Sequence, residues 1–209
     1  MTDRPDEFIP TRQSLLSRLR SWDDQESWSV FFNTYGRLIY DVARKAGLRD
    51  GEAQDVVQET IISVARELPQ FKYDPRLGSF KSWLRQIARR RIVDHFRRSP
   101  KEVLFSQGPA TGDTTHTAAE PDYQCERGTP FEEVWEAEWE RHLMHTALQR
   151  VREQVTPRQF QIFDYYVLQE MPLAKVTKAL GINAAQAYLA KHRVGRLLKR
   201  ELLKLDRQM

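Results

Sequence analysis

The stretch GSFKSWLRQIARRRIVDHFRR, residues 78–98, constrains the fold more than any other part of the chain. Its apolar residues recur every three or four positions, which is the spacing of one stripe along an α-helix. Seven lysines and arginines fill other positions and are opposed only by Asp94. Because such a stripe has to be buried, the sequence predicts a helix over 79–98 that packs into a bundle and carries a cationic coat. The stripe consists of Phe80, Trp83, Leu84, Ile87, Ala88, Ile92 and Phe96.

Two segments before this helix have the same apolar spacing. One runs over 28–47, where Gly47 suits a helix C-terminal cap, and the other runs over 51–68, where Pro69 stops it. The stretch QFKYDPRLGS, residues 70–79, contains Pro and Gly and is predicted to be a loop. Glycine is sparse, with nine residues in 209, so the composition favours helix over strand. The predicted fold class is all-α.

Residues 101–130 differ in character, because they are rich in Gly, Pro, Thr and Ala and poor in large apolar residues. They are predicted to be a flexible linker. A second helical unit is expected to begin near Phe131. The sequence Thr156-Pro157-Arg158-Gln159 predicts another helix start, because it is a capping box with proline at the first helical position.

The last helical pair has the spacing of a helix-turn-helix. A short helix is predicted over 172–180, followed by a turn at Gly181 and a longer helix that Asn183 caps, with Gln186 completing a second capping box. A helical hairpin from any bundle can have the same pattern, but the basic second helix and the tight turn favour DNA binding.

The predicted organisation is therefore two small helical domains joined by a flexible linker. Residues 1–24 are an N-terminal leader, 25–99 form the first domain and 100–130 are the linker. Residues 131–209 form the second domain, which contains the helix-turn-helix.

The formal net charge of +4 conceals a strong segregation of charge along the chain. Residues 70–100 carry nine Lys and Arg against two Asp and Glu, as do residues 172–209, so each segment has a charge of +7. Residues 101–140 carry two against ten, which gives −8. Two basic segments separated by an acidic one indicate two polyanion-binding surfaces, although solvated helix faces would have the same composition.

Several classes of protein are disfavoured. The single cysteine, Cys125, excludes an internal disulfide and a cysteine-based zinc site. We find no apolar run long enough to span a bilayer and no signal peptide, so the expected location is the cytoplasm. An enzyme would need clustered carboxylates or histidines, and Glu138, His142 and His145 provide only a metal half-site without a partner motif. We therefore expect a protein that is not an enzyme, with no metal and no cofactor.

The two basic helices suit different forms of DNA. On the last helix, Gln186 could bond an adenine or only cap the helix, Leu189 could contact a thymine methyl, and Arg193 and Arg196 could reach guanine or phosphate. The helix over 79–98 instead has aromatic residues among its cations and in the preceding loop, a pattern typical of single-stranded DNA binding. The alternative for Phe80, Trp83 and Phe96 is that they form core.

The helix over 51–68 has a third kind of surface. Its apolar face is accounted for by other residues, which leaves Asp55, Gln58, Glu59 and Ile62 elsewhere on the helix. This cluster is either a plain solvated face or a docking site for a basic partner helix.

Three stretches together resemble a known family. They are DVVQETIISVARELPQF, GSFKSWLRQIARRRIVDHFRR and LAKVTKALGINAAQAYLAKHRVGRLLKREL. In order, spacing and length they are similar to the extracytoplasmic-function (ECF) group of bacterial RNA polymerase sigma factors, which belongs to the sigma-70 family. The resemblance covers roughly 25–99 and 132–205. It implies a transcription initiation factor that binds core RNA polymerase, recognises and melts the −10 promoter element and binds the −35 element.

The resemblance also implies roles for individual residues. The clamp helices of the largest polymerase subunit would dock on Asp55, Val56, Gln58, Glu59 and Ile62. The −10 element would be held by Phe71, Lys72, Ser79, Phe80, Lys81, Trp83, Arg85, Arg89 and Arg90. The −35 duplex would be contacted by Asn183, Gln186, Tyr188, Leu189, His192, Arg193 and Arg196. Other expected partners are the polymerase flap and a separate anti-sigma factor; no membrane and no small-molecule substrate are expected.

The sequence departs from the family pattern at a few positions. Thr177 replaces the usual Ala, Ala184-Ala185 replace more polar residues or glycine, and Lys191 stands where an aliphatic residue is usual, which leaves its role open. The alternative function is a stand-alone helix-turn-helix transcriptional regulator. That function leaves the first domain and its acidic face unexplained.

Overall fold

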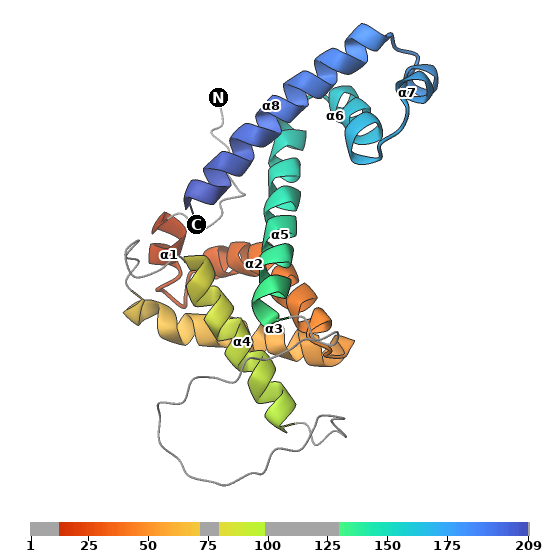
Figure 1. Cartoon of the computed structure of the whole chain (residues 1–209). Coiled ribbons are helices and arrows are strands. Elements are labelled where there is room, and N and C mark those ends of the chain that lie inside the picture. The colour runs from red at the N-terminus through yellow and green to blue at the C-terminus, as the bar shows by residue number, and fades with distance from the viewer. Residues whose placement is uncertain (1–12, 72–79, 99–129, 209) are drawn as a thin grey trace. The chain divides into compact units, whose positions relative to one another are not determined.

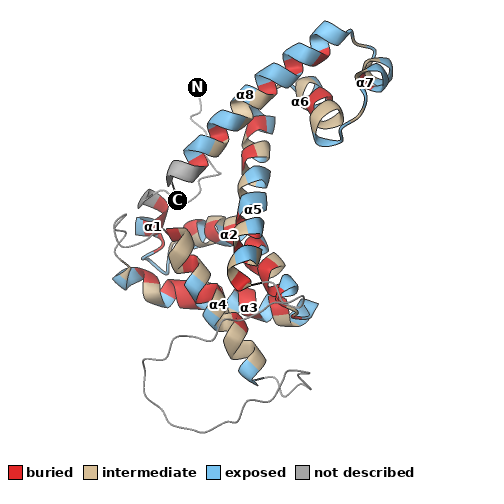
Figure 2. Ribbon diagram, viewed as in Figure 1, coloured by how far each residue is buried: buried red, intermediate tan, exposed pale blue. Residues whose placement is uncertain are grey.

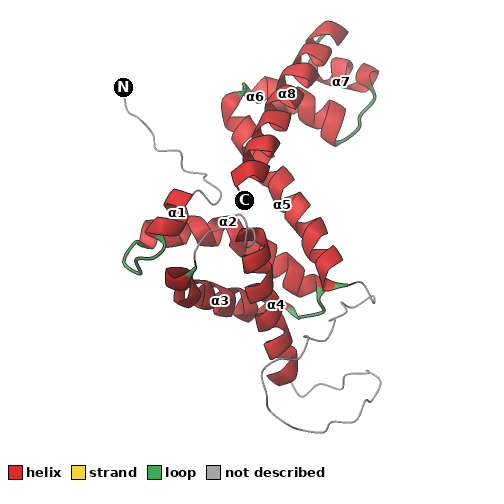
Figure 3. Ribbon diagram, turned by 60° about the vertical axis from the view of Figure 1, so that its left-hand side comes forward, coloured by secondary structure: helices red, strands yellow, loops and turns green. Residues whose placement is uncertain are grey.

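The computed structural model describes residues 13–71, 80–98 and 130–208 (Figure 1). Within these ranges the chain forms helices joined by short turns and contains no β-strand, which confirms the all-α prediction (Figure 3). None of the helices in the described ranges is both long and apolar enough to cross a membrane. Lys72 and Ser79, which were expected to contact DNA, lie outside the described residues, as do the first half of the expected leader and all but the last residue of the expected linker.

The chain divides into two compact units, and the division falls inside a helix. One unit is Leu16–Glu138, and the other contains Trp139–Met209 together with the residues before Leu16. Helix α5 (Phe131–Gln154) therefore contributes its first two turns to the first unit and the remainder to the second. The sequence placed the start of the second domain at residue 131, eight residues earlier.

Three helices form the body of the first unit, and α3 packs against both of the others. They are α2 (Gln25–Lys45), α3 (Asp50–Glu67) and α4 (Phe80–Arg98). A short 3-10 turn, η1 (Leu68–Gln70), follows α3 at the expected proline. As predicted, α2 ends before Gly47, whose φ of 101° is a conformation that glycine adopts without steric cost. Figure 2 shows the buried residues along one side of each helix.

An aromatic cluster joins the start of α4 to the middle of α2. The ring of Phe80 lies edge-on to Phe31, with centroids 6.3 Å apart, and is 5.4 Å from Tyr35. All three side chains are fully buried. Burying aromatic residues contributes more to a core than burying other residue types, so this cluster determines which side of α4 faces inward.

The expected leader is partly folded. Helix α1 (Gln13–Arg18) is followed by a turn in which Arg18 donates to Asp24 at 2.8 Å. Asp24 in turn caps α2 by accepting from the backbone N–H of Ser27 at 3.0 Å. Leu16 and Leu19 are buried. Their short apolar pattern is less than two helical turns long, which is why periodicity did not reveal it.

The second unit contains the end of α5 and four further elements. They are α6 (Pro157–Phe163), the π-helical turn η2 (Asp164–Leu168), α7 (Leu173–Leu180) and α8 (Ala184–Gln208). Both predicted capping boxes are present: Thr156 accepts from the N–H of Gln159 at 3.2 Å, and Asn183 accepts from the N–H of Gln186 at 2.8 Å. Caps of this kind each contribute about 1 kcal/mol.

Two apolar clusters hold this unit together. Val151 of α5 packs with Phe163 and Val194, and Ile162 of α6 packs with Ala187 and Ala190. The helix-turn-helix packing predicted between α7 and α8 is present, because Leu173 and Leu180 lie against the second cluster. At the far end of α8, the buried carboxylate of Glu201 accepts from Gln154 and Lys204 at 3.2 and 3.0 Å.

Replacing Gly181 with alanine should destabilise the second unit. Gly181 ends α7 in the left-handed region with φ of 59°, which costs an alanine about 1 kcal/mol. Gly51 is the matched control, because it lies in the first turn of α3, also has open space around its α-carbon, and gains helix propensity as alanine. Urea unfolding of the full chain should give a lower free energy for Gly181→Ala and an unchanged or higher one for Gly51→Ala. Equal effects would contradict the assignment of the turn.

Candidate functional site

The predicted docking residues of α3 lie mostly on one exposed face. Asp55, Gln58 and Ile62 are exposed, and Ile62 retains 43% of its surface. Glu59 is half-buried and accepts a hydrogen bond from Arg98 of α4 at 2.9 Å. Val56 is fully buried, so it supports the helix from the core side and has no surface to offer a partner.

A groove of about 570 Å³ runs beside this face, between α2 and α3. Its walls include Gly36 and Tyr40 from α2 and Gln58 from α3, and Phe32 is 50% exposed at its edge. Phe32 directly follows the core residue Phe31 in the apolar pattern of α2. Adjacent residues on a helix point about 100° apart, so Phe31 takes the core position and Phe32 is left outside.

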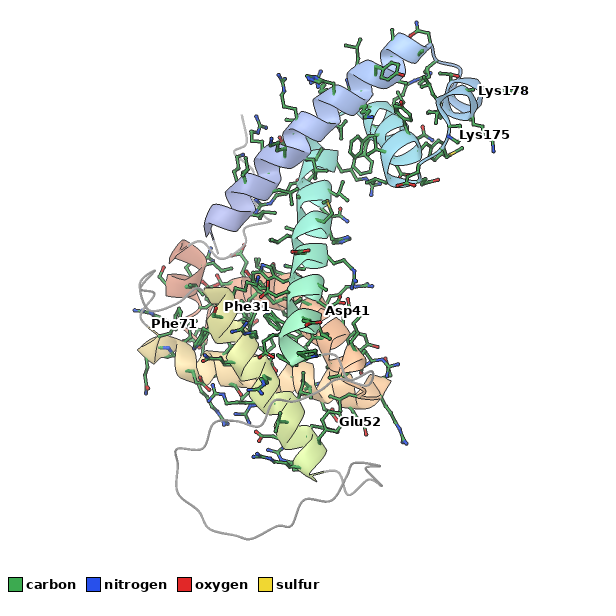
Figure 4. All side chains as sticks on the ribbon, in the orientation of Figure 1. Phe31, Asp41, Glu52, Phe71, Lys175 and Lys178 are labelled. Atoms are coloured by element: carbon green, nitrogen blue, oxygen red, sulfur yellow. The ribbon has the colours of Figure 1, made fainter. Side chains whose placement is uncertain are left out.

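The aromatic residues expected at single-stranded DNA divide into two groups. Phe80 is core, as described above, and has no exposed ring face. Trp83 is only half-buried, and its ring lies 4.4 Å from that of Phe71, which is labelled in Figure 4. Phe71 directly precedes in sequence the part of the expected loop that the structure does not describe.

The cations of α4 contact carboxylates of the same unit. Arg90 donates to Glu67 at 2.9 Å, and Arg91 contacts Asp94 at 3.2 Å, which gives a partner to a residue whose role the sequence left open. Lys81 and Arg85 both pair with Glu136, an early residue of α5. Exposed ion pairs contribute only about 0–1 kcal/mol, so phosphates could displace these carboxylates at little cost.

Buried aromatic residues, in addition to ion pairs, attach the start of α5 to the first unit. Phe131 and Trp135 are fully buried, and the side chain of Glu138 is 2% exposed and pairs with Lys45 of α2. Glu136 stands between these anchors on the helix. Its position against Lys81 and Arg85 therefore follows from the packing of Phe131 and Trp135 before it and the ion pair of Glu138 after it.

On α8 the buried and exposed sides separate as the helix-turn-helix interpretation predicts. Ala187, Ala190 and Val194 face the core, whereas Tyr188 is 53% and Leu189 is 70% exposed. The remaining predicted contact residues are exposed as well. They are Asn183, Gln186, His192, Arg193 and Arg196.

The side chain of Gln186 has a structural role in addition to any contact with DNA. Its Oε1 accepts from the backbone N–H of Asn183 at 3.0 Å, so the capping role that the sequence offered as one alternative is confirmed. A hollow of about 770 Å³ lies beside this end of α8 and is lined by Leu189, Arg193 and, from α6, Arg158.

Arg158 was not predicted as a site residue. It donates to the carbonyl oxygen of Leu180 at 2.9 Å and ties the start of α6 to the end of α7. Lys175 and Lys178 of α7 are also exposed and point away from the helix (Figure 4). Only the total charge of this segment could be predicted from the sequence, because the direction of each cation depends on tertiary packing.

The histidines that suggested a metal half-site do not gather a ligand set in the described part of the chain. No three His, Cys, Asp or Glu side chains there lie close enough together to hold an ion. Burial, with a smaller contribution from the charge of His145, lowers the pKa of His142 to about 4. His142 is therefore neutral at pH 7, and its ring lies 6.2 Å from that of Trp139.

Comparison with known proteins identifies relatives of this chain. The sigma-70 region 2 family matches residues 31–101. The RNA polymerase sigma factor NccH of Alcaligenes xylosoxydans xylosoxydans is 28% identical over 102 residues, which are 45% of this chain and 53% of NccH. The ECF RNA polymerase sigma factor BldN of Streptomyces coelicolor (strain ATCC BAA-471 / A3(2) / M145) is 27% identical over 168 residues, which are 80% of this chain and 55% of BldN.

The chain thus spans about half the length of these curated relatives. Among solved structures, CnrH in complex with the cytosolic domain of CnrY matches 94% of this chain and 99% of its own, at 17% identity and a TM-score of 0.36. Helices α2 to α4 therefore form a sigma-70 region 2 domain. The chain as a whole is similar to RNA polymerase sigma factors, among them the ECF sigma factor BldN.

Acidification should destabilise the protein through His142. Its pKa is about 4 in the folded chain and near 6.5 when unfolded, so below pH 6.5 the unfolded chain takes up a proton that the folded chain does not. The contribution to stability is complete above pH 6.5 and decreases as the pH falls toward 4. Urea unfolding between pH 7.5 and 5 should give a weaker pH dependence for His142→Gln than for the native chain. The same change at exposed His192 is the control, and parallel profiles for all three proteins would contradict the prediction.

Proposed function

We propose that the chain is a transcription initiation factor that binds core RNA polymerase and directs it to specific promoters. It would recognise and melt the −10 element with its first unit and bind the −35 element as duplex with its helix-turn-helix. The observation that carries the proposal is the combination, in one chain, of the region 2 match at 31–101 with a helix-turn-helix whose second helix exposes cations and apolar side chains. Its role would be binding without catalysis, in the cytoplasm and without a cofactor.

Core polymerase would dock on the exposed face of α3 and the adjoining groove. Asp55 and Glu59 supply negative charge for a basic partner helix, and Ile62 and Phe32 supply exposed apolar surface on either side. Clustered exposed apolar residues with charges around them are typical of protein interfaces. The expected partner is the pair of clamp helices of the largest subunit. The polymerase flap would contact the second unit, and a separate anti-sigma factor is a further expected partner.

The −10 element would be opened along α4. Lys81, Arg85, Arg89 and Arg90 would hold the backbone as phosphates replace their carboxylate partners. Because Phe80 is buried, we place the stacking surface for an unpaired base on Phe71 and Trp83. Flipping a base costs a few kcal/mol, and stacking on an aromatic side chain returns about 1–3 kcal/mol, so the pair can supply much of that cost. Lys72 and Ser79, which lie outside the described residues, remain predicted contacts of the −10 element.

The −35 element would be contacted by the first four turns of α8. Arg193 and Arg196 would reach guanine or phosphate, and Leu189 would meet a thymine methyl. Arg158 joins this set because it lines the same hollow. Asn183 and Gln186, whose side chains cap the helix, would contribute mainly by fixing where α8 begins.

The decisive experiment adds the purified chain to core RNA polymerase and measures transcription from a library of promoter sequences. Initiation restricted to promoters with common −10 and −35 sequences is the expected result. Binding to duplex DNA that is unaffected by polymerase would instead support a stand-alone regulator. Without selective initiation the proposal fails.

Asp55→Arg should abolish binding to core polymerase while the chain still folds, because Asp55 is exposed and the change places a cation against a basic partner. Glu153→Arg, the same reversal at an exposed position of α5, is the matched control and should keep native affinity. Fluorescence anisotropy with labelled chain gives the affinities for core polymerase, and native affinity for Asp55→Arg would contradict the docking assignment.

Arg193→Ala should weaken −35 recognition while binding to core polymerase persists. Fluorescence anisotropy with labelled chain gives both affinities.

Glu136→Gln should strengthen binding to single-stranded −10 DNA. The change removes the carboxylate that pairs with Lys81 and Arg85, so phosphates no longer compete with it. The affinity should rise on the order of two- to fivefold, in line with the small worth of partly exposed ion pairs. Glu133→Gln, at an exposed position one turn earlier, controls for the loss of overall charge. Anisotropy at fixed salt makes the comparison, and equal gains for both variants would mean that only net charge matters.

A further inference from the structure

The role of Lys191, which the sequence left open, follows from a contact between α8 and the turn η2. Lys191 lies three residues after Tyr188, so the two side chains share one side of the helix. The ring of Tyr166, from η2, lies against both: its centroid is 6.0 Å from that of Tyr188, and the Lys191 ammonium is 5.1 Å from it. The two tyrosine rings cross at 81°, an edge-to-face arrangement that aromatic pairs prefer.

The π-helical turn presents Tyr166 to α8. Its i to i+5 bond, from the N–H of Gln169 to the carbonyl of Asp164 at 2.9 Å, inserts one residue into the helical turn and shifts the side chains that follow it. Two further bonds close the turn: Gln169 Nε2 donates to Asp164 Oδ2 at 2.9 Å, and the N–H of Met171 donates to the carbonyl of Tyr165 at 2.9 Å. Glu170, with φ of 52°, then leads the chain into α7.

Tyr188 is therefore held in place before any ligand arrives. The neighbouring Tyr188 side chain, together with partial burial, raises the pKa of Tyr166, in keeping with the close packing of the two rings. Tyr188 is still 53% exposed and is adjacent to Leu189 in the helix turn that would face DNA. A contact residue that is ordered in the free protein loses less conformational entropy on binding.

We propose that Tyr166 and Lys191 are positioning residues for promoter recognition, which hold Tyr188 in the orientation that contacts the −35 duplex. This inference rests on the proposed function. The ammonium of Lys191 is directed to the face of the Tyr166 ring, as in other cation–π contacts, and does not bind a DNA phosphate. Lys191 thus differs from Lys199 of the same helix, which is exposed, is free of this ring contact and is assigned here to a phosphate contact.

The salt dependence of binding separates the two roles. The full chain in complex with core polymerase is titrated with a duplex carrying the −35 sequence selected from the promoter library, at several salt concentrations. Each phosphate contact that is lost reduces the slope of log affinity against log salt by about 0.9. Lys199→Gln should show this reduction. Lys191→Gln should keep the native slope while its affinity falls on the order of two- to fivefold.

Two further variants test the positioning itself. Lys191→Arg should restore the affinity, because a guanidinium also packs on an aromatic face. Tyr166→Leu should lower the affinity and relax the preference for particular bases in the −35 sequence, whereas Tyr166→Phe, which keeps the ring, should preserve most of both. A purely structural role would change the unfolding free energy without relaxing the base preference.

The outcomes distinguish failure of the inference from failure of the proposed function. If native complex selects no −35 sequence, the proposed function and the inference fall together. If it does select one, and Lys191→Gln reduces the salt slope as much as Lys199→Gln does, Lys191 is a phosphate contact and only the inference is overturned. An unchanged base preference in Tyr166→Leu would overturn it as well.

Discussion

The packing of Phe80 against Phe31 and Tyr35 is the constraint on which the first unit depends. Once this ring is buried, the rotation of α4 about its own axis is fixed, since Leu84, Ile87 and Ile92 follow it into the core. The same rotation leaves Trp83 at the edge beside Phe71 and brings Lys81 and Arg85 within reach of Glu136. The aromatic core and the candidate DNA surface are thus two sides of one helix.

Carboxylates of the chain stand where DNA phosphates are proposed to bind. Glu67 and Glu136 each contact a cation assigned to the −10 element, and these pairs are weak enough to be exchanged. Acidic residues elsewhere in the sequence offset the two segments of charge +7, so the net charge is only +4. The acidic residues are also local partners of the basic helix, so single-stranded DNA would have to compete for it.

Local signals were sufficient to predict much of this structure. The capping boxes at Thr156 and Asn183 and the glycine turns at Gly47 and Gly181 depend on neighbours within a few residues, so sequence spacing identifies them. Contacts over long separations were not predictable in this way. Helical spacing did not show which of Phe80 and Trp83 is the core residue. No sequence pattern predicted the ion pair between Glu136 and Lys81 or the π-helical turn η2. Family resemblance supplied the candidate sites, but the burial of Val56 and Phe80 had to come from packing.

The cap at the start of α8 has a consequence for how this helix can meet an anion. Backbone N–H groups at a helix N-terminus often form a ready phosphate site. Here the N–H of Gln186 is already donated to the Asn183 side chain, and that side chain oxygen occupies the place that an incoming phosphate would take. If α8 is the recognition helix, as proposed, it would therefore attract DNA through long side chains such as those of Arg193 and Arg196. These side chains could contact the duplex at more than one position along the groove, whereas Asn183 determines where the helix begins.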